Sequence, residues 1–106
     1  MYKLGALEEM VILLAAAMKE EAYAVSIARE YTSQTTNEIS IPAIHTVLKR
    51  LEDKGLLKSY ESSPTAERGG RKKRIYQITN SGYRLVSDLR DQREKLWTMI
   101  PKMSVS

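Results

Sequence analysis

The sequence has 106 residues, 42% of them hydrophobic, which is enough for one domain around one core. Lys and Arg number 17 against 13 Asp and Glu, and the resulting net charge of +4 weakly favours a polyanionic partner. The absence of cysteine excludes disulfides, thiolate metal sites and cysteine nucleophiles. The longest apolar run, residues 10–18, is too short to span a membrane and follows two glutamates instead of a basic leader. We therefore expect a cytoplasmic protein with no membrane segment.

Two helices are predicted in the first third of the chain. Across residues 4–19 apolar side chains recur every three or four positions, which is the pattern of a helix with one buried face. A shorter stripe of the same kind covers residues 22–31. The polar run over residues 32–37 then predicts a loop that ends the second helix.

A third helix with a clear start and end follows. Ile39 and Ile41 flank Ser40 in alternation, which predicts a very short strand before the helix. Ser40 is also a suitable N-cap, and Pro42 suits the first turn because an N–H there would have no helical partner. The apolar stripe runs to about residue 54, where Gly55 can adopt the left-handed conformation that ends a helix.

A β-hairpin with a basic tip is predicted next. Residues 56–62 and 74–78 have the length and composition of strands, and residues 64–70 are rich in turn formers. Five of the seven residues in 68–74 are cationic, and the two glycines among them let the backbone turn close to a phosphate chain. Without its context, a basic run is a solvated loop or a localisation signal about as often as it is a phosphate-binding segment. Its position between two strands favours contact with phosphates.

The chain ends in a long helix that Thr79 can cap and that Pro101 frays or bends. Its apolar residues fall at heptad spacing, interrupted only by Gln92, and they exceed what one small domain can cover. A two-fold homodimer is the natural consequence, with Trp97 as an interface anchor in preference to an effector contact. The predicted interface comprises Leu7, Met10, Leu85, Leu89, Leu96, Trp97, Met99 and Ile100.

This order of elements predicts a mainly α fold with a small β-hairpin: a winged helix-turn-helix plus a long C-terminal dimerisation helix. Residues 1–79 would form the DNA-binding domain and residues 80–106 the dimerisation helix. In a winged helix the third helix enters the major groove and the hairpin follows the DNA backbone. Five side chains opposite the apolar stripe are placed to face base edges: Ala43, His45, Thr46, Lys49 and Arg50.

Four blocks of the sequence resemble the PadR family of bacterial transcriptional regulators, over residues 4 to about 97. They are LGALEEMVILL (4–14), AYAVSI (22–27), SIPAIHTVLKRLEDKGLL (40–57) and RGGRKKRIYQITNSG (68–82). They resemble the opening helix, the second-helix motif, the recognition helix, and the wing with the start of the last helix. The chain departs from the family at Ala24, where a Gly is usual, and at His45, where a Tyr that approaches the DNA backbone is usual.

The resemblance implies a repressor that dimerises through its last helix and, in many members, releases DNA on binding a small hydrophobic or aromatic effector. A dimer predicts a pseudo-palindromic operator on double-stranded DNA. The predicted DNA-binding residues are Tyr23, Ser40, Pro42, Ala43, His45, Thr46, Lys49, Arg50, Arg68, Gly69, Gly70, Arg71, Lys72 and Lys73.

Two other classes of function compete with this interpretation. A winged helix can serve as a protein-interaction module that reads no DNA sequence, with the basic loop gripping an acidic partner. The sequence does not support an enzymatic function. It has no Gly-rich phosphate-binding loop with its Lys, and His45 is accompanied by no second His and no Cys. The acidic pairs Glu8–Glu9 and Glu20–Glu21 read as solvated or helix-capping. We expect no metal and no cofactor.

Overall fold

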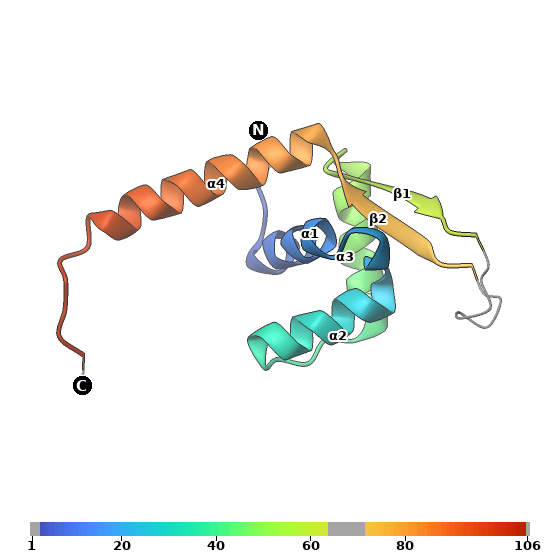
Figure 1. The fold of residues 1–106 in the computed structure, drawn as a ribbon, viewed down its shortest axis with the longest axis horizontal. Helices are drawn as coiled ribbons and strands as arrows, with labels where there is room; N and C mark the ends of the chain where they lie inside the picture. Colours follow the sequence, from blue (N-terminus) through green and yellow to red (C-terminus); the bar gives the residue numbers. More distant parts are fainter. Residues whose placement is uncertain (1–2, 64–71, 106) are drawn as a thin grey trace.

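The computed structural model describes residues 3–63 and 72–105. Its elements, in chain order (Figure 1), are α1 (Ala6–Met18), the 3₁₀ turn η1 (Lys19–Glu21), α2 (Ala24–Thr35), α3 (Ile41–Asp53), β1 (Leu57–Glu61), β2 (Arg74–Ile78) and α4 (Asn80–Thr98). The predicted fold class is confirmed: a mainly helical winged helix-turn-helix with one small hairpin and a long last helix.

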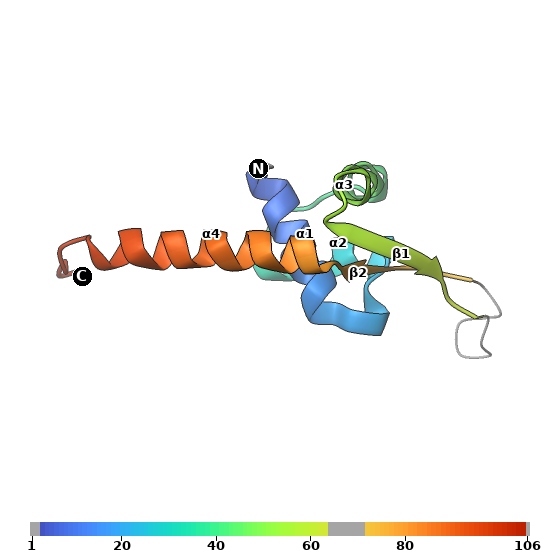
Figure 2. The same ribbon diagram turned by 90° about the horizontal axis from the view of Figure 1, so that it is seen from above.

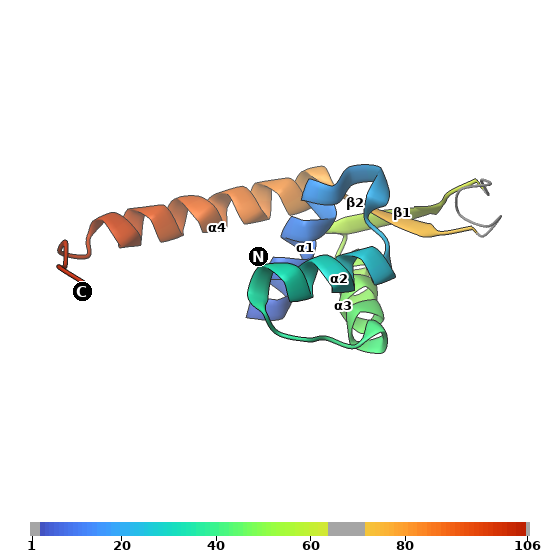
Figure 3. The same ribbon diagram turned by 60° about the horizontal axis from the view of Figure 1, so that its bottom comes forward.

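Helices α1, α2 and α3 pack against one another around a single core, and the hairpin closes this core beside α1 and α3 (Figures 1 and 3). Full burial of an aliphatic side chain contributes about 1.5–3 kcal/mol, so each member of this cluster stabilises the domain. The largest fully buried side chains are Val11, Ile12, Ile27, Ile44, Leu48, Leu51, Leu56, Leu57 and Ile75.

The hairpin is antiparallel, with Leu57 opposite Ile78 and Glu61 opposite Arg74. On the free edge of β2, the Tyr76 N–H donates a hydrogen bond of 2.8 Å to the carbonyl of Ala22. The segment between η1 and α2 is therefore hydrogen-bonded to the free edge of the hairpin.

The prediction of a short strand over residues 39–41 is wrong, because Ile41 is already the first residue of α3. The competing signal was the Ser40 hydroxyl, which accepts a hydrogen bond of 3.2 Å from the Ala43 N–H and starts the helix at that point. The end of α3 agrees with expectation, since Gly55 follows it with a φ of +75°.

Helix α2 extends beyond its predicted end at residue 31. The hydroxyls of Thr32 and Thr35 donate to the carbonyls of Ala28 and Tyr31, at 3.2 and 2.7 Å, so these polar side chains are compatible with a helix. The helix stops at Thr36, which has a left-handed φ of 61°.

Helix α4 begins directly on the turn that ends α3. Thr79 caps α4 as predicted, its hydroxyl accepting from the Gly82 N–H at 3.0 Å and donating to the Gly55 carbonyl at 2.7 Å. The Thr79 N–H donates to the Leu56 carbonyl at 3.1 Å. Gly82 lies so close that a Cβ built there would be 2.2 Å from the Leu56 oxygen. This junction fixes the start of α4 against the end of α3.

Beyond the junction α4 runs away from the core, while the hairpin extends toward the opposite end of the 54 Å long axis (Figure 2). Every side chain of residues 91–98 is exposed, and the helix ends before Pro101. Among the described residues, no helix is both long and apolar enough to cross a membrane.

Candidate nucleic-acid interface

Helix α3 presents a polar face that its own start holds in place. The buried stripe of Ile44, Val47, Leu48 and Leu51 fixes the helix against the core. Around this stripe, the predicted base-facing set lies at the surface, with Ala43 half-buried and the others exposed: His45, Thr46, Lys49 and Arg50. Pro42, predicted as a further DNA contact, is also exposed.

Two polar groups of this face, the Thr46 hydroxyl and the Lys49 ammonium, have contacts that leave them able to bind DNA. The Thr46 hydroxyl donates to the Pro42 carbonyl at 3.1 Å, which leaves its oxygen lone pairs and methyl group free for a base. Lys49 Nζ lies 3.8 Å from Asp53 Oδ1, with both side chains more than half exposed. An exposed pair of this spacing contributes only about 0.3–0.5 kcal/mol, so the Lys49 ammonium can exchange Asp53 for a DNA acceptor.

The described part of the hairpin, residues 57–63 and 72–78, is called here the hairpin arm, and two of its cations, Lys72 and Arg74, have different surroundings. Lys72 is 63% exposed and pairs only loosely with Glu61, at 3.8 Å. Arg74 bonds to the same carboxylate at 3.5 Å and to the Ser59 hydroxyl at 3.2 Å, and Ser59 in turn donates to Glu52 of α3 at 2.7 Å. Arg74 therefore links the two strands of the hairpin and supports Ser59, which makes the hydrogen bond to α3. Arg74 is also part of the basic run identified in the sequence.

This network was missed by sequence reasoning. The signal was present in the strand register, because Glu61 and Arg74 stand directly opposite each other and opposite charges across a pair stabilise a sheet. Four predicted contacts, Arg68, Gly69, Gly70 and Arg71, lie outside the described residues.

Tyr23 is placed at the N-cap of α2 and is half-buried. The Lys73 ammonium lies over its ring, 4.7 Å from the ring centroid. Two residues that were predicted separately as DNA contacts are therefore in contact with each other.

Glu8, predicted as solvated or helix-capping, is a helix cap and is also buried. It caps α1, accepting from the Gly5 N–H at 3.0 Å, and it pairs with Lys54 at the end of α3, also at 3.0 Å. The Gly5 hydrogen bond and the Lys54 charge hold the pKa of the Glu8 carboxyl below its ordinary value, against the opposing effect of burial. The Glu8–Lys54 pair thus fastens α3 to α1.

The predicted interface residues fall into three environments. Leu85 belongs to the core of its own chain, and Leu7, Met10 and Leu89 are half-buried. The remaining four project from the distal part of the chain and are exposed: Leu96, Trp97, Met99 and Ile100.

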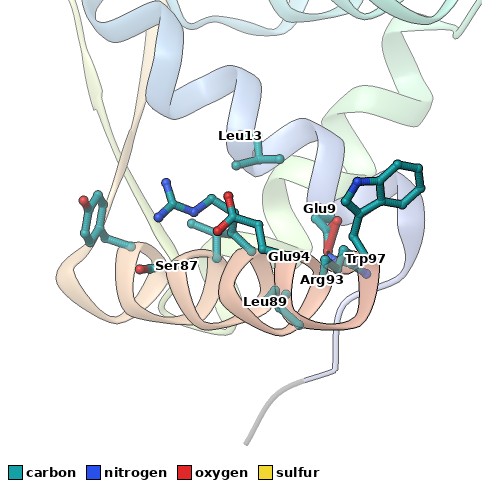
Figure 4. Close-up of a pocket in the computed structure, with 10 residues that line it drawn as sticks. Glu9, Leu13, Ser87, Leu89, Arg93, Glu94 and Trp97 are labelled. Atoms are coloured by element: carbon teal, nitrogen blue, oxygen red, sulfur yellow. Dashed lines mark hydrogen bonds and ion pairs between the residues drawn. The ribbon is translucent and has the colours of Figure 1, made fainter. Parts of the chain in front are cut away.

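An apolar groove of about 640 Å³ lies between α1 and α4. Figure 4 shows Leu13 on one wall and Leu89 and Trp97 on the other, with Arg93 of α4 reaching Glu9 of α1. This ion pair bridges the two helices across the groove.

Comparison of the sequence with known protein families identifies the family of this chain. The model of the transcriptional regulator PadR-like family matches residues 13–88. No curated protein matches the sequence.

Solved structures share the fold at low identity. A PadR-like transcription factor from Bacteroides fragilis is 24% identical, with a TM-score of 0.69 over 85% of this chain and 82% of its own. A PadR-like regulator from Bacillus cereus is 18% identical, with a TM-score of 0.73 over 89% and 86% of the two chains. A PadR family regulator from Clostridium difficile is 20% identical, with a TM-score of 0.71 over 89% and 93%. Because the family model matches more than half of the sequence, the chain belongs to the PadR-like family, whose members are DNA-binding transcriptional regulators and not enzymes.

Proposed function

We propose that this protein is a cytoplasmic repressor that binds a pseudo-palindromic operator as a homodimer and releases it on binding a small hydrophobic or aromatic effector. The observation that carries the proposal is the exposed polar face of α3, held by a buried stripe and flanked by the hairpin. Such a face is what a major-groove helix requires, since it presents donors and acceptors without disturbing the core.

The two parts of the site have different tasks in this proposal. His45, Thr46, Lys49 and Arg50 read base edges, and the start of α3 with the hairpin arm contacts phosphates. Phosphate contacts supply affinity that falls with salt, whereas base contacts supply discrimination.

The exposed apolar residues of the C-terminal part support a second copy as partner. Leu96, Trp97, Met99 and Ile100 are 61, 72, 71 and 52% exposed, and they form an apolar surface that a two-fold partner would cover. Dimerisation would set the two α3 helices about one DNA turn apart, which is the spacing of two half-sites.

The groove between α1 and α4 is the favoured place for an effector. Its apolar walls suit a planar hydrophobic molecule, and because most of its lining comes from α4, between Tyr83 and Trp97, a ligand there would favour one angle between the two α4 helices of the dimer. The ligand shifts the equilibrium only by its differential affinity for the DNA-bound and free arrangements. Trp97 serves first as an interface anchor in this arrangement.

Selection of bound sequences from a random duplex pool at physiological salt tests DNA readout. A palindromic consensus is expected, whereas diffuse and salt-labile binding would favour the interaction module that reads no sequence. A promoter carrying the consensus should rise in activity when the gene is deleted, and a fall would exclude repression.

Light scattering after size-exclusion chromatography tests the dimer. Leu96→Asp should give a monomer, because a charge at a buried apolar contact is costly. Gln77→Asp, on the exposed side of the hairpin, introduces the same charge and should stay dimeric. A dimeric Leu96→Asp protein would contradict the assigned interface.

A further inference from the structure

The arm of the hairpin holds Lys73 in a fixed position. The Ser62 N–H donates to the Lys73 carbonyl at 2.7 Å, and the Lys73 N–H donates to the Ser62 hydroxyl at 3.0 Å. These bonds continue the hairpin one residue beyond β2. Both backbone polar groups of Lys73 are therefore hydrogen-bonded, which fixes the point from which its side chain extends.

The start of α2 holds Tyr23 equally firmly. The Tyr23 N–H donates to the Ser26 hydroxyl at 3.1 Å, and its carbonyl accepts from the Ile27 N–H at 2.9 Å. The preceding residue, Ala22, is hydrogen-bonded to Tyr76 of β2. The hairpin and the start of α2 therefore meet at two points, one through the backbone and one where the Lys73 ammonium lies over the Tyr23 ring.

We propose that Tyr23 is a positioning residue for DNA binding, which holds the hairpin arm in one orientation relative to the helix-turn-helix through the Lys73 ammonium above its ring. The inference rests on the proposed DNA-binding role of the hairpin. A cation over the face of an aromatic ring is attracted by the ring quadrupole, and the contact fixes the direction of an otherwise flexible side chain. Lys73 then acts on DNA affinity through the orientation of the arm.

The neighbouring lysine provides a matched comparison. Lys72 is 63% exposed, and within residues 3–63 and 72–105 it makes only the loose pair with Glu61, which leaves its ammonium able to approach a phosphate. Removing a phosphate contact lowers the slope of log affinity against log salt by about 0.9, whereas removing a positioning contact lowers affinity and leaves the slope unchanged.

The test measures binding of the full chain to a labelled mixed-sequence duplex of about 30 base pairs, long enough for two half-sites, across a salt series. Lys73→Met and Tyr23→Leu should each weaken binding about two- to fivefold at unchanged slope, and the double variant should be no weaker than either single variant. Tyr23→Phe, which keeps the ring, should bind like wild type. Lys72→Met should lower the slope by about one unit.

Several results would overturn the inference. If Lys73→Met lowered the slope and its loss multiplied with that of Tyr23→Leu, Lys73 would contact phosphate independently. If Tyr23→Phe lost as much affinity as Tyr23→Leu, the hydroxyl and not the ring would matter. Thermal midpoints identify any variant that fails to fold. The remaining variants still distinguish a positioning role of Lys73 from a direct phosphate contact.

A measurement without DNA separates this inference from the proposed function. In the free protein the ring current of Tyr23 should shift the ε-methylene protons of Lys73 upfield of those of Lys72, and Tyr23→Leu should abolish the shift. Absence of the shift overturns the positioning contact whatever the DNA result. A wild-type chain that binds no duplex overturns the proposed function and the positioning role together.

Discussion

Substitution of Gly82 by Ala tests the junction between α3 and α4. In most helix positions this change stabilises a protein, because Ala has a helix propensity about 1 kcal/mol better than Gly. Here the new Cβ would lie 2.2 Å from the Leu56 oxygen and 2.9 Å from Cγ1 of Ile78, so the Leu56 peptide must move by about 1 Å. That peptide accepts the Thr79 N–H, and its neighbour Gly55 accepts the Thr79 hydroxyl.

Overpacking costs about 1–3 kcal/mol and each weakened hydrogen bond about 1 kcal/mol, so we expect a net destabilisation of about 2–4 kcal/mol. For a chain of this size the thermal midpoint should fall by about 10–20 °C. Circular dichroism melts at one fixed protein concentration measure it, since dimerisation makes the midpoint concentration-dependent.

Gly5→Ala is the matched control. A Cβ at Gly5 would meet only Glu8 Oε1, at an ordinary 3.7 Å, and loss of a Gly N-cap costs less than about 1 kcal/mol. A Gly82→Ala protein as stable as wild type would refute the assigned contact between the start of α4 and the Leu56 peptide.

Three further predictions follow from other contacts. Because the pKa of Glu8 is depressed, its contribution to stability is present above the ordinary value of 4.5 and is lost as the pH falls through the lower folded value. The difference in thermal midpoint between wild type and Glu8→Gln should therefore shrink on acidification, and a constant difference would show that the charge is irrelevant. Ser40→Ala removes the N-cap of α3 and should cost about 1 kcal/mol in urea unfolding, while Ser63→Ala, at an exposed position outside any helix, should cost almost nothing. Lys49→Ala should weaken operator binding by about 1–3 kcal/mol and barely change binding to random duplex; equal losses on both would mean that Lys49 contacts phosphate only.

The helices with long apolar stripes and clear caps were predictable from the sequence. Ser40 and Gly55 mark the ends of α3, and Thr79 marks the start of α4, because capping depends on residues within three or four positions of each other. The hairpin followed from composition, and β2 has the predicted bounds.

The errors arose where distant or competing contacts decide. Ile39 and Ile41 alternate over too few residues to outweigh the Ser40 cap. Residues 32–35 are helical, and the hydroxyls of Thr32 and Thr35 bond to carbonyls of the preceding turn. The burial of Glu8 depends on Lys54, which is 46 residues away in the sequence, so local pattern gives no sign of it. The heptad spacing predicted that Leu85 lies on an apolar face of the last helix. It gave no indication that Leu85 is buried in the core of the same chain.

The junction at Thr79 and Gly82 has a consequence for how operators diverge among such regulators. Since α4 is seated on the turn that ends α3, the angle between these helices is set inside one chain. Under the proposed function, with a dimer joined through α4, the crossing of the two α4 helices would determine the separation of the half-sites, and α3 would determine the bases read within each half-site. Substitutions in α4 would then alter operator spacing while leaving sequence preference intact, so that the two properties could evolve separately.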